Sequence, residues 1–199
     1  MKTARPRCPT CERPLSTCLC RWVTPVVCRT EVFILQHPLE VNHAKNTARL
    51  LHLSLPSSHL RVGESFGEAD LGATGASRST VLLYPVDEQP LSTAQPWDAG
   101  APVDPDHLRL VVLDGTWRKS RKMLHLSPWL QGLPRLSLEG ALPSAYLIRR
   151  AHKPGQLSTL EATCAALAQL EGCAPALAPL LRAFDGFVAQ QLAHWPQSR

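Results

Sequence analysis

The sequence predicts an α/β fold, a largely parallel sheet with helices on both faces. Short apolar runs of strand length alternate along the chain with amphipathic segments of helix length. The run at 110–113 is apolar throughout, which is typical of a strand buried on both faces of a parallel sheet. At 199 residues the chain suits one domain, or one domain with a small appendage.

The first half of the fold begins with a strand at 31–37 (EVFILQH) and an amphipathic helix at 42–55. Glycine and serine mark a loop at 63–79, before a second strand at 80–85 (TVLLYP) that its final proline stops. Four prolines at 88–105 indicate a long surface connection.

The second half begins with a strand at 108–114 (LRLVVLD), followed by a helix at 117–126. Shorter strands are predicted at 133–138 and 145–150. Ser158 and Glu161 have the spacing of a capping box, which predicts a helix from there to about residue 170. A last helix is expected at 176–193.

Composition favours a polyanionic partner without demanding one, because the formal net charge is +5 and the pI is about 9.0. The N-terminal MKTARPRCPTCERPL has no apolar core of a signal peptide, and no apolar run approaches a membrane span. We therefore expect a cytoplasmic protein with no membrane partner. In that compartment seven cysteines indicate metal or free thiols before disulfides.

Four cysteines lie close together near the N-terminus, in a segment rich in proline and arginine: Cys8, Cys11, Cys18 and Cys20. Two close pairs of thiols suit tetrahedral zinc, and unmetallated thiols are the alternative. Four thiolates leave no open position for a substrate, so the predicted zinc is structural rather than catalytic. We predict a small zinc knuckle with four cysteine ligands at 1–28 and a separate α/β domain at 29–199.

Polar residues gather where the predicted strands end, and the stretch DGTW at 114–117 raises the sharpest question. In one interpretation it is a capped turn, in which Gly115 supplies unusual backbone angles and Thr116 caps the next helix. In the other it is a ligand-binding loop, because ligands of open α/β sheets bind at the carboxyl ends of strands. His37, Asp114, Arg149 and the capped helix start then line one cleft.

Each of these residues also has an ordinary structural interpretation. His37 can simply turn the chain before a proline, Arg149 can pair with Glu161, and Trp117 can belong to the core. Basic residues form three clusters that suit a phosphate backbone, although a solvated helix face is the default interpretation of such a cluster. The clusters are Arg118, Arg121, Lys122 and His125; Arg149, Arg150, His152 and Lys153; and Arg5, Arg7, Arg13 and Arg21.

Taken in order, the elements LQHPLE, NTARLL, LLYP, LDGTW, YLIRR and LSTLEA, after a cysteine-rich start, resemble the DTW domain family over nearly all of residues 8–171. The family takes its name from an Asp-x-Thr-Trp element, here Asp114, Thr116 and Trp117. It is similar to SPOUT-type enzymes, and this resemblance implies a C-terminal trefoil knot around S-adenosylmethionine.

The resemblance also implies a reaction. The family includes tRNA-uridine aminocarboxypropyltransferases, which move the 3-amino-3-carboxypropyl group of S-adenosylmethionine to N3 of a uridine, typically in the tRNA variable loop, and release methylthioadenosine. By this resemblance the cofactor-binding residues are Leu83, Tyr84, Pro85, Leu113, Gly115, Thr116, Ser158 and Thr159, and the catalytic residues are Asp114, Trp117 and Arg149. Asp114 is either the base for the uridine proton or an anchor for the cofactor ammonium group, and Arg149 binds the cofactor carboxylate or a tRNA phosphate.

Two other functions remain open at this point. One is a SPOUT-type RNA methyltransferase, which would release S-adenosylhomocysteine instead of methylthioadenosine. The other is a non-catalytic zinc-knuckle RNA-binding module, although an adaptor would not need LDGTW and LSTLEA. If the protein is an enzyme of either kind, its expected partners are tRNA and S-adenosylmethionine, and the oligomeric state is left open.

Overall fold

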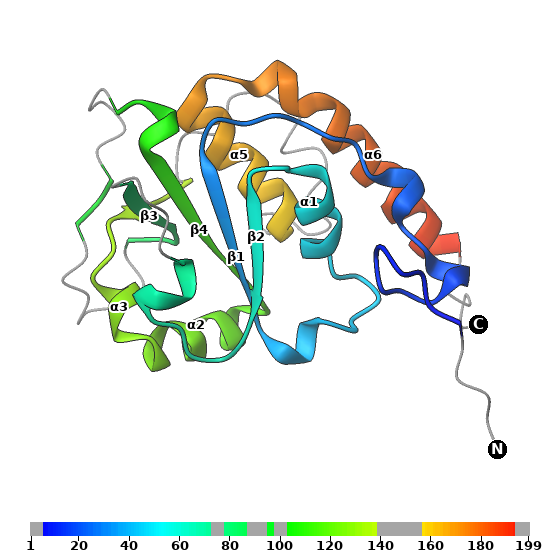
Figure 1. Ribbon diagram of the computed structural model, residues 1–199, viewed down its shortest axis with the longest axis horizontal. Coiled ribbons are helices and arrows are strands. Elements are labelled where there is room, and N and C mark those ends of the chain that lie inside the picture. The colour runs from blue at the N-terminus through cyan, green and yellow to red at the C-terminus, as the bar shows by residue number, and fades with distance from the viewer. Residues whose placement is uncertain (1–5, 73–77, 87–94, 98–102, 139–156, 194–199) are drawn as a thin grey trace.

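A parallel sheet forms the centre of the computed structural model, which describes residues 6–72, 78–86, 95–97, 103–138 and 157–193 (Figure 1). Within those residues the sheet has five strands in the order β2-β1-β4-β3-β5, and every pairing is parallel. The strands are β1 (Glu31–Gln36), β2 (Ser58–Val62), β3 (Ser79–Leu83), β4 (Leu108–Asp114) and β5 (Arg135–Leu136). The predicted parallel sheet is therefore confirmed.

Helices cover both faces of the sheet, as predicted (Figure 1). The α-helices are α1 (Ala48–Ser54), α2 (Trp117–Leu126), α3 (Pro128–Gln131), α5 (Thr159–Glu171) and α6 (Ala174–Ala193). Short 3-10 helices are η1 (Leu15–Thr17), η2 (Cys20–Trp22), η3 (Pro38–Glu40), η4 (Glu68–Leu71) and η5 (Pro105–His107). In the described part of the chain no helix is long and apolar enough to cross a membrane.

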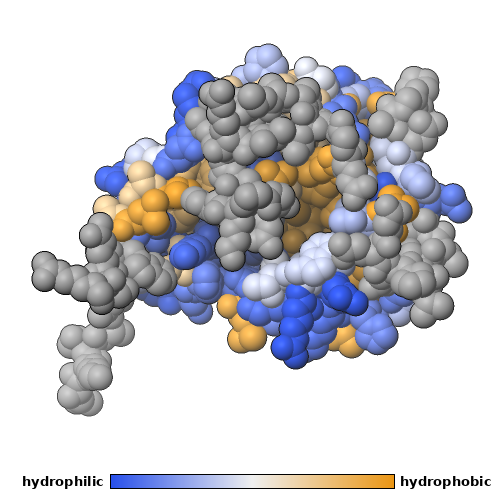
Figure 2. All heavy atoms as spheres, turned by 180° about the vertical axis from the view of Figure 1, so that it is seen from behind, coloured by the Kyte–Doolittle hydropathy of each residue, from blue (hydrophilic) through white to orange (hydrophobic). Residues whose placement is uncertain are grey.

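Two apolar cores lie on opposite faces of the sheet because successive side chains of a strand point to opposite sides. On β1, Val32 and Ile34 pack with α1, α5 and α6, whereas Phe33 and Leu35 pack with α2 and α3. Both sets are at most 1% exposed, which explains why this strand is apolar without alternation. Figure 2 shows the face opposite to that of Figure 1, where apolar side chains gather at the centre and hydrophilic ones border them.

The N-terminal half differs from the sequence prediction in two places. The helix expected at 42–55 begins only at Ala48, because the Asn46 side chain accepts a hydrogen bond from the Ala48 amide at 3.1 Å and residues 41–45 form turns. The edge strand β2 was not predicted, since its sequence SHLRV is short and half polar.

In the C-terminal half, the strand predicted at 133–138 is reduced to β5, and the one at 145–150 lies outside the described residues.

The capping box at the start of α5 is confirmed. Ser158 Oγ accepts a hydrogen bond from the Glu161 amide at 3.2 Å, and Glu161 Oε2 accepts one from the Ser158 amide at 2.8 Å. The helix ends at Gly172, whose φ of 64° lies in the left-handed region that glycine tolerates best. The N-terminal position of α5 is thus fixed by its own sequence.

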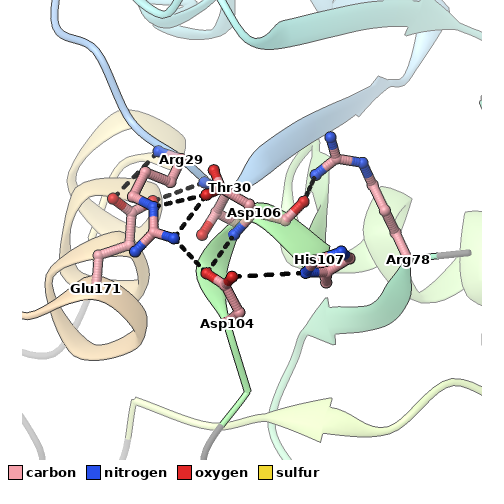
Figure 3. A network of polar contacts seen from close by, with 7 residues as sticks. All are labelled: Arg29, Thr30, Arg78, Asp104, Asp106, His107 and Glu171. Carbon is pink, nitrogen blue, oxygen red and sulfur yellow. Dashed lines mark hydrogen bonds and ion pairs between the residues drawn. The ribbon is translucent and has the colours of Figure 1, made fainter. Parts of the chain in front are cut away.

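A polar network around Arg29 lies at the amino-terminal edge of the sheet, where β1 and β4 begin (Figure 3). Its guanidinium pairs with Asp104 and Asp106, which precede β4, and its amide donates to Glu171 at the end of α5. The Glu171 carboxylate also accepts from the Thr30 amide at 2.8 Å. These contacts hold the starts of β1 and β4 close to the C-terminal end of α5.

The cysteine-rich N-terminal segment packs against α6 and shares its core (Figure 1). Leu19 is fully buried there, and the Trp22 indole donates a hydrogen bond to Gln190. A Cβ atom on Gly186 would overlap the Trp22 ring, so this helix position requires glycine. Both ends of the described chain are therefore held together.

Candidate functional site

Asp114, the last residue of β4, is a buried carboxylate at the carboxyl edge of the sheet, with 4% of its surface exposed. Its Oδ2 accepts hydrogen bonds from Gln36 Nε2 at 2.8 Å and from Asn46 Nδ2 at 2.6 Å. Its Oδ1 accepts one from Thr159 Oγ1 at 2.7 Å. These donors offset the cost of burying a charge.

The three donors come from β1, from the turn before α1 and from the start of α5. Asp114 therefore joins three segments that are far apart in the sequence. A carboxylate offers about four acceptor directions, two on each oxygen. Within the described residues Oδ2 is saturated and Oδ1 retains one direction for a ligand.

An aromatic pair lies at the same carboxyl edge of the sheet. Tyr84 directly follows β3 and is buried, and its ring stacks on Trp117 with 5.1 Å between centroids and 12° between planes. Trp117 is 44% exposed, so its assignment to the core, the alternative considered above, is wrong. The Arg135 guanidinium lies 5.2 Å from the centre of the Tyr84 ring, on which it is a cation–π partner. The stack presents a flat aromatic surface at the edge of the sheet.

Two expectations for the DGTW turn are wrong. Among the described glycines only Gly72 and Gly172 have positive φ, so Gly115 does not supply left-handed backbone angles. A Cβ atom on Gly115 would instead lie 3.1 Å from Lys119 Cβ, so its small size allows the turn to approach α2. Thr116 stands at the N-cap position, but its side chain makes no capping hydrogen bond.

The other predicted cofactor residues lie on the neighbouring strand ends. Leu83 and Pro85 are partly buried on either side of Tyr84, Leu113 is partly buried beside Asp114, and Ser158 is committed to the capping box. Thr159 is the one of this set that contacts the carboxylate. Arg149, with the suggested pair to Glu161, lies outside the described residues.

His37 has the structural role considered for it. Its Nδ1 accepts a hydrogen bond from the Leu39 amide at 3.1 Å, and its Nε2 lies 2.9 Å from Glu64 Oε1. Lys122 donates to the same carboxylate at 2.7 Å and holds the pKa of Glu64 below its usual value. On the same helix, Arg118 and Arg121 are exposed to solvent.

The four N-terminal cysteines converge as their spacing predicted. Their Sγ atoms all lie within 4.8 Å of one another, with 3.6 Å between Cys8 and Cys20 and 3.7 Å between Cys11 and Cys18. Backbone N–H groups of Cys11 and Thr10 lower the pKa of the Cys8 thiol to about 6, which favours a thiolate. Four convergent thiols are a donor set that zinc prefers.

Gln36 and Asn46 are site residues that sequence reasoning missed. Gln36 ends the otherwise apolar run VFILQ, and a lone amide at a strand end was a usable signal. Asn46 fell inside the predicted helix at 42–55, and no separate role was predicted for it. Its role depends on the turn that replaces the first part of that helix.

Comparison with known proteins identifies the family. A family model described as "DTW domain" matches residues 5–192. The chain is 30% identical over 202 residues to tRNA-uridine aminocarboxypropyltransferase 2 of Macaca fascicularis, covering 98% of this chain and 66% of that protein. It is 35% identical over 176 residues to the Drosophila melanogaster protein of the same name, covering 84% and 67%.

A more distant relative is tRNA-uridine aminocarboxypropyltransferase A of Arabidopsis thaliana, 29% identical over 134 residues, with 60% of this chain and 50% of that protein covered. The chain thus spans about two thirds of the length of the animal relatives. No solved structure matches it. The match to the family model over 5–192 confirms the resemblance drawn from the motifs, and the chain belongs to the DTW domain family.

Proposed function

We propose that this protein is a tRNA-uridine aminocarboxypropyltransferase, which transfers the 3-amino-3-carboxypropyl group of S-adenosylmethionine to N3 of a uridine in tRNA. The observation that carries the proposal is its 30–35% identity to relatives of that name over 84–98% of the chain. The buried carboxylate and the exposed aromatic stack at one strand edge support it, because ligands of parallel sheets bind there. A cytoplasmic location belongs to the same proposal.

The SPOUT-like fold with its C-terminal trefoil knot is also a proposal. Residues 139–156, which would carry much of the knot, lie outside the described chain. What supports it is the parallel sheet, together with the attachment of the α5 start to the end of β4. The division into a knuckle at 1–28 and a catalytic domain at 29–199 stays a prediction.

We assign the cofactor surface to the ends of β3 and β4 and the start of α5. Leu83, Tyr84 and Pro85 would form one wall, the turn at 113–117 a second, and Ser158 with Thr159 the third. Trp117 offers an exposed ring face that suits stacking with a flat heterocycle such as adenine. S-adenosylmethionine supplies an activated sulfonium, whose γ-carbon is open to a nucleophile.

In the proposed reaction a bond forms between uridine N3 and that γ-carbon while the bond from carbon to sulfur breaks. Methylthioadenosine leaves, and the N3 proton must pass to a base. Asp114 has one acceptor direction left on Oδ1, which suits either that proton or the ammonium group of the amino acid arm. Arg149 is proposed to bind the cofactor carboxylate or a tRNA phosphate. Positioning then supplies much of the rate enhancement, because the donor is already activated.

Zinc is proposed as a structural ion held by Cys8, Cys11, Cys18 and Cys20. With all four ligand positions filled by thiolates, no position remains for a substrate. The ion would fix the fold of the knuckle and take no part in the transfer.

The by-product of the reaction tests the proposed function. The full chain is incubated with S-adenosylmethionine and tRNA transcribed without modifications, and the products are separated by mass spectrometry. We expect methylthioadenosine in an amount equal to the modified uridine. S-adenosylhomocysteine would instead establish a methyltransferase, and neither product with any tRNA would indicate the RNA-binding module.

A further inference from the structure

A cavity of about 290 Å³ lies between the N-terminal knuckle, the turn before α1 and the carboxyl ends of β1 and β2. Its volume is at the small end of ligand pockets, suited to one nucleotide rather than to a helix of RNA. Its polar lining consists mostly of arginines and amide side chains: Arg7, Arg13, Arg49, Gln36, Asn42 and Asn46. This cavity is separate from the cofactor surface assigned above.

The three arginines that line the cavity differ in their partners and in their exposure to solvent. Arg49 forms an ion pair with the Glu12 carboxylate. Arg13 is partly buried and donates to the carbonyls of His43 and Ala44. Arg7 also donates only to neutral oxygens within the described residues, the Glu12 carbonyl at 2.6 Å and Asn42 Oδ1 at 3.1 Å, but unlike Arg13 it is exposed. Its positive charge is therefore not offset by a carboxylate and is available to an anion.

The cavity also shares a wall with the Asp114 site. Gln36 and Asn46 line the cavity, and the same two side chains donate to Asp114 Oδ2. In the sheet order β2-β1-β4-β3-β5, the cavity is at the β2 and β1 side of Asp114, whereas Tyr84 is at the β3 side. A ligand in the cavity and a ligand on the aromatic stack would thus lie on opposite sides of Asp114, and the cavity ligand would contact the two amides that donate to Oδ2.

We propose that this cavity binds a nucleotide of the tRNA substrate, with a phosphate at Arg7 and the base toward the amide side chains. The inference rests on the proposed function and specifies where the RNA lies relative to Asp114. Asparagine and glutamine offer both donors and acceptors, as the polar edge of a nucleobase requires. An arginine that keeps neutral partners can retain them and still bind a phosphate oxygen.

The test is the affinity of the full chain for unmodified tRNA as a function of salt concentration. Arg7→Gln removes the charge, whereas Asn42→Asp retains the partner of Arg7 and neutralises it with a carboxylate. Arg182→Gln, which changes an exposed arginine of α6 away from the cavity, is the matched control. For both cavity variants we expect the Kd for tRNA to rise about 5- to 10-fold. The slope of the logarithm of the binding constant against the logarithm of the salt concentration should become less steep by about one. Arg182→Gln should bind like the wild type, and all three should bind S-adenosylmethionine normally.

Tight tRNA binding with an unchanged salt slope in both cavity variants would overturn the inference. Should Arg7→Gln melt early, Asn42→Asp decides, because it preserves the contact with residue 7. The proposed function fails separately, if the wild type releases no methylthioadenosine. In that case a weakened tRNA affinity of the cavity variants still places RNA in the cavity.

Discussion

Thr159 Oγ1 donates a 2.7 Å hydrogen bond to Asp114 Oδ1, which joins the first residue of α5 to the last residue of β4. The two residues are 45 positions apart in the sequence. Because the capping box independently fixes the start of α5, the hydroxyl arrives at the carboxylate in a set position. Asp114 therefore links the end of β4 to the start of α5, and it is also the residue to which we assign a role in the proposed reaction.

Replacing Asp114 by asparagine should impair turnover far more than folding. The change removes the charge but retains an oxygen for Gln36 and Asn46, and the Thr159 hydroxyl can turn to accept from the new amide. We expect a loss of about 1–2 kcal/mol in the free energy of unfolding, because hydrogen bonds to a charge are stronger than neutral ones. We expect single-turnover release of methylthioadenosine to slow by about a hundredfold or more.

The affinity for S-adenosylmethionine, measured on the same variant, separates the two roles of Asp114. A normal affinity indicates the base, and a weakened one indicates the anchor for the ammonium group. Thr159→Ser is the control, because it retains the hydroxyl. A fully active Asp114→Asn enzyme would exclude both roles.

Enlarging Gly115 should weaken cofactor binding through a steric effect. A Cβ atom there lies 3.1 Å from Lys119 Cβ, and Lys119 pairs with Glu40 at 2.7 Å, so its side chain is not free to withdraw. We expect Gly115→Ala to reduce the affinity for S-adenosylmethionine a few-fold and Gly115→Val to reduce it more. Calorimetry checks both, and unchanged affinity in Gly115→Val would place the cofactor elsewhere.

Removing the zinc ligands should affect the whole fold. The purified protein should contain about one zinc ion per chain, and Cys8→Ser with Cys11→Ser should contain none. Zinc at a free concentration about a thousandfold above its Kd adds about 4 kcal/mol to the free energy of unfolding. For a chain of this size that corresponds to a fall of roughly 10 °C in Tm when the site is lost. Cys173→Ser should retain both the zinc and the Tm, and zinc that survives the double change would refute the ligand assignment.

The stability of the protein should fall in mild acid partly because of His52. Burial lowers the pKa of this imidazole below its ordinary value of 6.5, with the positive charge of Arg49 acting in the same direction. In the window between the lowered folded pKa and 6.5, the unfolded chain binds more protons, so stability decreases as the pH falls. His52→Gln should lose less Tm than the wild type between about pH 7.5 and 5.5. The exposed His125→Gln serves as the comparison, and an identical loss in all three proteins would contradict this cause.

The elements predicted best from the sequence are those whose apolar pattern decides their burial. The runs of β1 and β4, the helix α2 and the capping box of α5 were all identified, because period and capping are local signals. The edge strand β2 was missed because it gains its hydrogen bonds from β1, a partner that no local pattern reveals. The start of α1 was misplaced for a similar reason, since the Asn46 side chain competes with the first helical turn.

The candidate site shows the same limit. Asp114 could be identified from a polar residue ending an apolar strand. Its pairing with its amide partners could not, because Gln36 lies opposite it through the register of β1 and β4, and Asn46 reaches it from the turn before α1. The role of Gly115 was misassigned because glycine has two uses, unusual backbone angles and close packing. Only the position of Lys119 Cβ distinguishes them.

The contact of Trp22 with Gly186 has a consequence for biosynthesis. Trp22 and its hydrogen-bond partner Gln190 are separated by 168 residues, so the N-terminal segment leaves the ribosome long before its docking surface on α6 exists. At about 5–20 residues per second, the delay is roughly 10 to 30 s. During that interval the indole ring and Leu19 are exposed to the crowded surroundings of the nascent chain. An early-binding zinc ion would protect the segment by folding it while it waits for the last helix.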